Sequence, residues 1–453
     1  MTQLTARPSS TRSVMAVVTV GVLLSGFDLF IVNVALGDIA ASIGVSDLAD
    51  LSWILNAYAI TFAALLVPAG RVSDLIGAKN GFLLGLLVFT LASAACAFSP
   101  GLGSLVAFRI VQAAGAAMMI PSSLGLVLSS FPPEGRGGAV RLWAGLGGVG
   151  AALGPVVGGI LVQADWRWIF LVNVPLGLAA AAVGWRVLPD TAGHPGRRPG
   201  LVGAVLLTAT VATLVLLLVD GSDWGWTSTR TLTVGAIVVA GLALNAYAVV
   251  RSADPIVSLS LLRTPHFTSM SLTLLTFHVA FGAMLLALVL WLQDVWDLSA
   301  LQTGLSIAPG PLLVPFVAVL GGRLVARIGA RPVIMLGTGV FAAGVASWAL
   351  LAGPETSYAG TILPGMLLTG IGVGLIVPPA TAVGCSQLPP ERHSTGSAVL
   401  QTARQVGIAV GVAALVAILA AREPGPEAFV VAWWTTAAFA VLAGVTAMGR
   451  SER

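Results

Sequence analysis

Apolar residues form long stretches along this chain, and polar residues gather in the short segments between them. Each stretch has about the 20 residues that an α-helix needs to cross the hydrocarbon core of a bilayer. The pattern predicts about fourteen membrane-spanning helices, at residues 13–36, 50–69, 80–99, 103–128, 138–163, 167–188, 200–219, 231–250, 267–292, 303–322, 332–352, 357–383, 397–420 and 427–448.

Composition favours the same class. Of the 453 residues, 57% are hydrophobic and 9% are charged, which is too little polar surface to coat a soluble globule. The net charge of +4 does not indicate nucleic-acid binding, because the arginines are scattered singly between apolar stretches. Cys96 and Cys385 have no disulfide or metal spacing, so we interpret them as packing residues. The first stretch is too long for a signal peptide, so we expect it to be retained.

The basic residues predict the orientation. If the N-terminus is cytoplasmic, the segments outside the membrane carry only Arg167, Arg230 and Arg422, and most acidic residues fall there as well. The remaining loop arginines and Lys79 lie inside, as the positive-inside rule requires. We therefore expect a multi-pass protein of the cytoplasmic membrane with both termini in the cytoplasm.

An internal repeat predicts the domain organisation. Residues 70–79 align without gaps on residues 322–331, and residues 132–134 recur at 389–391. Both displacements shift the pattern by an even number of helices, so the two copies share one orientation in the membrane. The predicted order is a tail (1–12), a six-helix repeat (13–188), a linker (189–199), two inserted helices (200–266), a second six-helix repeat (267–448) and a tail (449–453).

Two charged residues lie within predicted spans at similar depth. Asp28 is roughly 12 Å and Arg109 roughly 9 Å from the outer ends of their helices, from the rise per residue. A charge at a bilayer centre costs about 2.5–3.5 kcal/mol on insertion scales, so we interpret the pair as a proton-coupling site. The alternatives are a neutral Asp28 that bonds a neighbouring helix and an Arg109 that extends to the outer surface. Arg404 lies near the cytoplasmic end of its helix and is expected to extend to that surface.

The loop after the second predicted helix carries Gly70, Arg71, Asp74 and Gly77. The glycines allow a tight turn, and Asp74 can accept hydrogen bonds from a basic side chain or a helix N-terminus of the other repeat. We predict a conformational latch, which the second copy lacks because Ala326 replaces the acid. The alternative is a solvated loop, which is the favoured interpretation for Lys79.

Small residues recur along the fifth predicted helix, at Gly150, Gly154, Gly158 and Gly159, with Pro155 among them. Such spacing permits close helix packing, and proline removes a backbone hydrogen bond and kinks the helix. We expect this helix to pack against the other repeat and to bend during a conformational cycle. A generic packing motif is the alternative.

Several kinds of chemistry have no matching motif. Lys79 is the only lysine, and no phosphate-binding loop surrounds it, so we expect no use of ATP. No metal-spaced or nucleophile–base cluster appears, which predicts a protein that is not an enzyme and has no cofactor. The energy source would be an ion gradient, with protons favoured over sodium because one isolated carboxylate is a poor cage for sodium.

The chain resembles the major facilitator superfamily, and within it the fourteen-helix drug:proton antiporters of the QacA and EmrB type. The resemblance covers nearly the whole chain and is carried by residues 28–36, 70–79, 109–115, 150–159 and 166–175. It implies two parallel six-helix repeats plus two inserted helices, and proton-coupled export. Phe30 and Gly37 stand where the family usually has threonine and proline, which leaves the substrate range open.

A substrate cavity is expected between the repeats near the midplane. Its candidate lining residues are Asn33, Phe30, Asn56, Tyr58, Gln112, Met118 and His278. We expect a monomer that exports hydrophobic or cationic small molecules in exchange for protons. The alternatives are export of one endogenous metabolite, proton-coupled import, and a non-transporting receptor or scaffold.

Overall fold

The computed structural model describes residues 11–45, 48–191, 193, 201–251, 255, 257, 259–353, 357–386, 388–422 and 425–448. Side chains are described in these ranges except at residues 29, 30, 33, 34, 48, 49, 151, 152, 155, 201, 222, 223, 259, 262 and 300. Most of the predicted N-terminal tail (1–12), the predicted C-terminal tail (449–453) and most of the predicted linker (189–199) therefore lie outside the described residues.

The described chain is helical from end to end. The first half contains α1 (Thr11–Ile43), α2 (Leu48–Ile76), α3 (Ala78–Ala97), α4 (Leu102–Ser130), α5 (Pro133–Val162), α6 (Trp168–Leu171) and α7 (Asn173–Val187). Two further long helices follow, α8 (Leu201–Trp224) and α9 (Thr229–Arg251). The second half contains α10 (Leu259–Arg263), α11 (Pro265–Leu290), α12 (Ala300–Ile307), α13 (Pro309–Ile328), α14 (Ala330–Leu351), α15 (Leu363–Cys385), α16 (His393–Ala420) and α17 (Pro426–Ala447).

Within the described residues, 13 helices are long and apolar enough to cross a membrane. They include α8 and α9, so the predicted inserted pair is helical as expected. The predicted span at 138–163 falls in α5, which is not among the 13. A total of fourteen spans therefore stays a prediction.

Two predicted single helices are interrupted. The span expected at 167–188 is divided at Val172 into α6 and α7, and the span expected at 303–322 begins as α12 and is divided at Ala308. Prolines follow both breaks, at Pro175 and Pro309. Because proline has no N–H group to donate, it is tolerated in the first turn of a new helix but weakens a continuous one.

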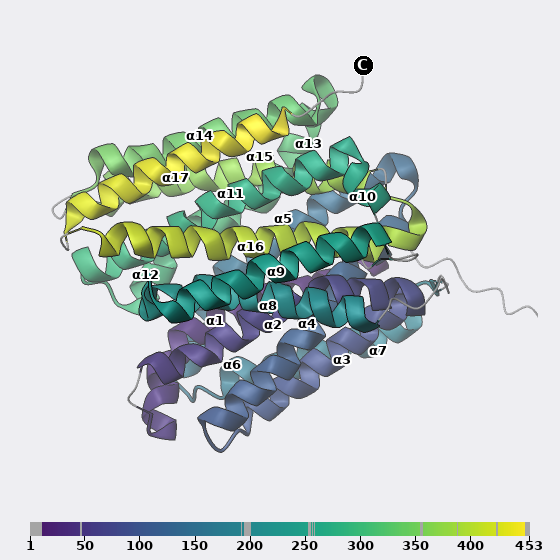
Figure 1. Ribbon diagram of the computed structural model, residues 1–453, viewed down its shortest axis with the longest axis horizontal. Helices are drawn as coiled ribbons and strands as arrows, with labels where there is room; N and C mark the ends of the chain where they lie inside the picture. Colours follow the sequence, from purple (N-terminus) through teal and green to yellow (C-terminus); the bar gives the residue numbers. More distant parts are fainter. Residues whose placement is uncertain are drawn as a thin grey trace, which may run out of the picture.

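Equivalent helices have equivalent neighbours in the two halves of the chain. α1 packs on α5 as α11 packs on α16, and α3 packs on α4 as α14 packs on α15. The halves meet where α2 and α4 contact α16 and where α5 contacts α13 and α15. This arrangement agrees with two parallel repeats that form a bundle with a seam between them. Figure 1 shows α8 and α9 lying across this seam, beside α2 and α16.

Tight packing of α3 on α4 depends on glycine at position 115. A methyl group at Gly115 would lie 2.5 Å from the backbone nitrogen of Phe89, whereas a methyl group at Gly103 of the same helix would meet nothing within 4 Å. We therefore predict that Gly115→Ala destabilises the protein by about 1–3 kcal/mol through overpacking. The melting temperature of the purified protein measures the loss. Gly103→Ala is the matched control, and equal melting temperatures for the two variants would contradict the prediction.

Candidate functional site

The structure brings Asp28 of α1 and Arg109 of α4 into direct contact. Arg109 Nη1 lies 2.5 Å from Asp28 Oδ2, and the two side chains are at most 1% exposed. Arg109 therefore does not extend to the outer surface. Burying both charges is costly, and the cost is offset only when each charge is paired and its remaining hydrogen-bonding groups are satisfied.

Gln112, one turn along α4 from Arg109, closes a hydrogen-bonded ring with this pair. Its Nε2 donates to Asp28 Oδ1 at 2.8 Å, and its Oε1 accepts from Arg109 Nη1 at 2.7 Å. The same Nε2 donates to Ser93 Oγ at 2.6 Å, and Asn173 Nδ2 donates to that oxygen at 3.0 Å. We call these five residues the Asp28 cluster. It joins α1, α3, α4 and α7.

The Arg109 guanidinium also holds α2. Its Nε donates to the backbone carbonyl of Ile54 at 3.2 Å, and its carbon lies 4.2 Å from the centre of the Tyr58 ring. Phe170 is a second aromatic neighbour at 5.9 Å. Aromatic faces stabilise a desolvated cation. The two rings therefore stabilise the buried Arg109 guanidinium in addition to the Asp28 carboxylate.

Protonation of Asp28 is incompatible with this arrangement. A carboxylate accepts hydrogen bonds at both oxygens, and here both oxygens accept from cationic or amide N–H groups. A proton on Asp28 would remove the charge that balances Arg109 and would place a donor among donors. The observed ion pair therefore requires a charged Asp28, and a proton on Asp28 would leave Arg109 without its counter-charge.

Asp74, at the end of α2, contacts the first turn of α16 in the other half of the chain. It accepts hydrogen bonds from the backbone N–H groups of Ser394 and Thr395 at 2.9 and 2.8 Å, and from the Thr395 hydroxyl at 2.6 Å. A carboxylate stabilises a helix N-terminus because the first N–H groups of the helix have no partner within it. Of the two partners predicted for Asp74, the structure therefore has the helix N-terminus.

The other residues of the predicted latch lie around this contact. A methyl group at Gly70 would lie 2.8 Å from the backbone oxygen of Ser394, so glycine permits the close approach of α2 to α16. Gly77 ends the segment with φ +92, a conformation that favours glycine. Arg71 is buried. Lys79 Nζ lies 2.6 Å from Asp190 Oδ1, whose side chain is 91% exposed, so Lys79 forms an ion pair at the surface.

The equivalent end of α13 is built differently. Ala326 offers no carboxylate, and the guanidinium of Arg141 from α5 lies beside Gly322. The two repeats are therefore held together unequally at this end of the bundle, which agrees with the expected asymmetry.

The glycines of α5 divide between two neighbours, because the helix contacts α13 and α15 of the other repeat, as expected, and also packs along α1 of its own repeat. Gly150 and Gly158 face α1, where added methyl groups would lie 2.9 Å from Leu23 O and 2.7 Å from Ile31 Cγ1. Gly159 faces the other repeat, at Leu301 of α12. Gly154 is buried, and the Pro155 side chain lies outside the described residues. Close packing on α1 accounts for Gly150 and Gly158.

A second polar cluster lies between α11 and α16. His278 Nδ1 donates to Leu274 O at 2.6 Å, and His278 Nε2 accepts from Arg404 Nε at 3.0 Å. This pair of bonds requires a neutral imidazole, since guanidinium N–H groups only donate. Arg404 Nη1 also donates to Gln401 Oε1 at 2.7 Å. The expectation that Arg404 extends to the nearby surface was wrong, because its partner on α11 draws it inward.

The remaining candidates for the substrate cavity are dispersed. Asn56 donates to Ser52 at 3.3 Å, Met118 packs at the edge of the core, and the side chains of Phe30 and Asn33 lie outside the described residues. A cavity of about 440 Å³ lies elsewhere, between α2, α8, α9, α11 and α16, and none of the described candidates lines it. Their contact with substrate stays a prediction.

Sequence reasoning assigned no role to Ser93 and Asn173, although both complete the Asp28 cluster. The available signal was weak. Each is a polar residue within an apolar stretch, and Asn173 stands at the break between α6 and α7.

Removing the guanidinium should reveal how much the Asp28 cluster contributes to stability. We predict that Arg109→Gln destabilises the protein by about 3–5 kcal/mol, because it leaves Asp28 buried without its counter-charge. Arg167→Gln is the control, since it removes a pair with Asp165 whose side chains are 38% and 43% exposed and should cost at most about 1 kcal/mol. Thermal unfolding of the three proteins in lipid nanodiscs compares them. Similar losses in both variants would exclude a special contribution from the buried pair.

The Asp74 contact can be tested by distance measurement. Asp74→Asn retains one acceptor oxygen and places an amide against backbone donors, so we predict a longer and broader distance between spin labels at residues 80 and 391, which lie at this end of the bundle. Double electron–electron resonance measures this distance, with the two labels attached to cysteines introduced into an otherwise cysteine-free protein. Asp190→Asn, which removes only the exposed partner of Lys79, should leave the distance unchanged. An unaltered distance in Asp74→Asn would show that this contact does not hold the two halves together.

Comparisons with known proteins agree with this architecture. The family model described as Major Facilitator Superfamily matches residues 18–412. The chain is 33% identical to the multidrug resistance protein Stp of Mycobacterium tuberculosis over 88% of this chain and 74% of that protein. It is 32% identical to the methylenomycin A resistance protein of Streptomyces coelicolor over 96% and 91%, and 31% identical to the tetracenomycin C resistance and export protein of Streptomyces glaucescens over 89% and 75%.

Solved structures show the same fold at low sequence identity. The human organic anion transporter MFSD10 (TETRAN) aligns with a TM-score of 0.71 and 16% identity, over 97% of this chain and 99% of that chain. The family model covers most of the chain, and the relatives named as resistance proteins cover it at above 30% identity. The chain belongs to the Major Facilitator Superfamily, and it is a multi-pass membrane transporter rather than an enzyme.

Proposed function

We propose that this transporter exports hydrophobic or cationic small molecules from the cytoplasm in exchange for protons, as a fourteen-helix drug:proton antiporter. The observation that carries the proposal is the fully buried Asp28–Arg109 pair, because a proton bound at Asp28 would remove the charge that balances Arg109. The relatives named as multidrug and antibiotic resistance proteins support efflux as the direction.

In the proposed cycle, Asp28 takes up a proton while the site faces outward, and substrate leaves. After reorientation Asp28 loses the proton to the cytoplasm, and the ion pair with Arg109 forms again as substrate binds. A ligand shifts such an equilibrium only through its different affinity for the two states. Substrate must therefore favour the conformation in which Asp28 is charged.

The packing suggests how the Asp28 cluster could act on the second repeat. Asp28 lies on α1, and the closest glycine contact of α5, that of Gly158 with Ile31, is with α1. On its other side α5 contacts α13, where a methyl group at Gly148 would lie 3.3 Å from Val314 Cβ. Release of Arg109 would free α1 from α4 and alter the position of α5 at the seam. The Asp74 contact with α16 would then have to open in the state that faces the cytoplasm.

Proton-coupled flux tests the proposal. We predict that adding a transported compound to acid-loaded inside-out vesicles dissipates the pH gradient, and that Asp28→Asn abolishes this response because residue 28 can no longer bind and release a proton. The panel would contain lipophilic cations, neutral hydrophobic compounds, methylenomycin A and tetracenomycin C. A pH-sensitive dye reports the gradient.

The control is Asp165→Asn, which changes a partly exposed acid near the end of α5 and should retain the wild-type response. Equal responses in wild type and Asp28→Asn would contradict the role of Asp28. Dissipation by a single compound alone would favour a dedicated exporter, an alternative supported by the relative named for tetracenomycin C resistance and export. Movement of substrate and protons across the membrane in the same direction would favour proton-coupled import.

A further inference from the structure

We infer that the cavity beside α8 and α9 is a binding site for neutral, largely apolar molecules that carry a hydroxyl or amide group, and that these molecules reach it from the bilayer. The inference rests on the proposed export function and gives it a substrate class and an entry site. It also assigns a function to α8 and α9, which line the cavity.

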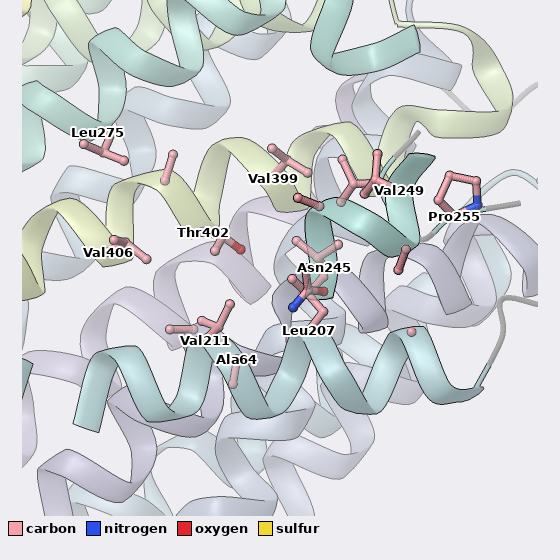
Figure 2. A pocket seen from close by; sticks show the side chains of 17 residues that line it. Ala64, Leu207, Val211, Asn245, Val249, Pro255, Leu275, Val399, Thr402 and Val406 are labelled. Atoms are coloured by element: carbon pink, nitrogen blue, oxygen red, sulfur yellow. The ribbon is translucent and has the colours of Figure 1, made fainter. Parts of the chain in front are cut away.

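The cavity lies at the seam between the two halves of the chain. Its walls come from α2 and α8 on one side and from α9, α11 and α16 on the other, with Ala64, Leu207 and Val406 among the apolar lining residues (Figure 2). Its volume of about 440 Å³ is within the range of sites that hold drug-sized ligands. A molecule in this cavity would contact both halves of the transporter at once.

The lining excludes charge. Among the described residues that form the walls, none is ionisable. A cation placed here would lose its hydration without gaining a counter-charge, which is strongly unfavourable in an apolar site. The cavity therefore suits neutral ligands, and a cationic substrate would have to use another site.

Two polar groups interrupt the apolar walls. Thr402 lines the cavity from α16, and its Oγ1 is buried without a hydrogen-bond partner among the described residues. On the α9 side, Asn245 uses its amide N–H groups on Thr210 and Gly241 O, both at 2.9 Å, so its Oδ1 remains as an acceptor. A buried hydroxyl without a partner costs stability in the empty protein, and a ligand hydroxyl or amide would supply the missing partner.

The position of the cavity indicates access from lipid. The opposite face of α9 is exposed, with Leu244 at 53% and Val250 at 70%, as expected for a helix that faces acyl chains. The cavity is thus separated from the bilayer by one helix. It lies in the half of the bundle that contains Asp74, since its lining residues in α2 come from the second half of that helix and its lining residues in α16 from the first half.

Binding of three matched pyrene probes to the full chain in lipid nanodiscs tests the inference: 1-pyrenemethanol, 1-methylpyrene and (1-pyrenylmethyl)trimethylammonium. We expect saturable binding of the alcohol above empty nanodiscs, weaker binding of the methyl compound, and no saturable binding of the cation at this cavity. Thr402→Val should weaken binding of the alcohol by about fivefold, the effect of one lost hydrogen bond, and leave the methyl compound unaffected.

Filling the cavity provides the second variant. Leu207→Trp adds bulk inside it and should abolish probe binding, whereas Val205→Trp, on the exposed side of the same helix, should not. Binding that is unchanged in Leu207→Trp would overturn the inference. So would an absence of saturable binding in the wild type, as expected if a lipid acyl chain permanently fills the cavity.

Transport of the alcohol separates this inference from the proposed function. If Leu207→Trp loses binding but still exports the alcohol at the wild-type rate, the cavity is not on the substrate path and the inference fails while antiport stands. If the probes bind as predicted but the wild type moves no compound against a proton gradient, the proposed function fails and the binding site stands.

Discussion

A pair of opposite charges buried within one repeat constrains the packing of half the molecule. Asp28 and Arg109 are both shielded from solvent, so neither can lose its partner without a large cost in stability. The hydrogen bonds around this pair engage Gln112, Ser93, Asn173 and the Ile54 carbonyl. Helices α1, α2, α3, α4 and α7 are therefore positioned by one polar cluster as well as by apolar contact.

The two repeats are held by different polar contacts. The second repeat has a different polar cluster, in which Arg404 bonds a neutral His278 and, in the part of the chain that the structure describes, no carboxylate takes part. At the end of the bundle that holds Asp74, a carboxylate joins α2 to α16, whereas the equivalent position near Ala326 has none. One repeat therefore carries both the buried ion pair and the acidic contact, and the other supplies the helix N-terminus that this contact needs.

The sequence predicted the features that depend only on position along the chain. Helix positions followed from apolar stretches, and the similar depth of Asp28 and Arg109 followed from the rise per residue. Several features that depend on helix rotation and on distant neighbours were not predicted. Gln112 was expected to line a cavity but closes the Asp28 cluster, and Arg404 turns inward because His278 lies on a helix 126 residues away in the chain. The cavity beside α8 and α9 needs five helices to form, so no local pattern indicates it.

Infrared difference spectroscopy of the purified protein tests most directly whether Asp28 is the group that exchanges protons. We predict a protonated-carboxyl band that appears as the pH is lowered, disappears when a transported compound is added, and is absent in Asp28→Asn. A band that is unchanged in Asp28→Asn, or that does not respond to a transported compound, would contradict the role of Asp28 and assign proton coupling to another group.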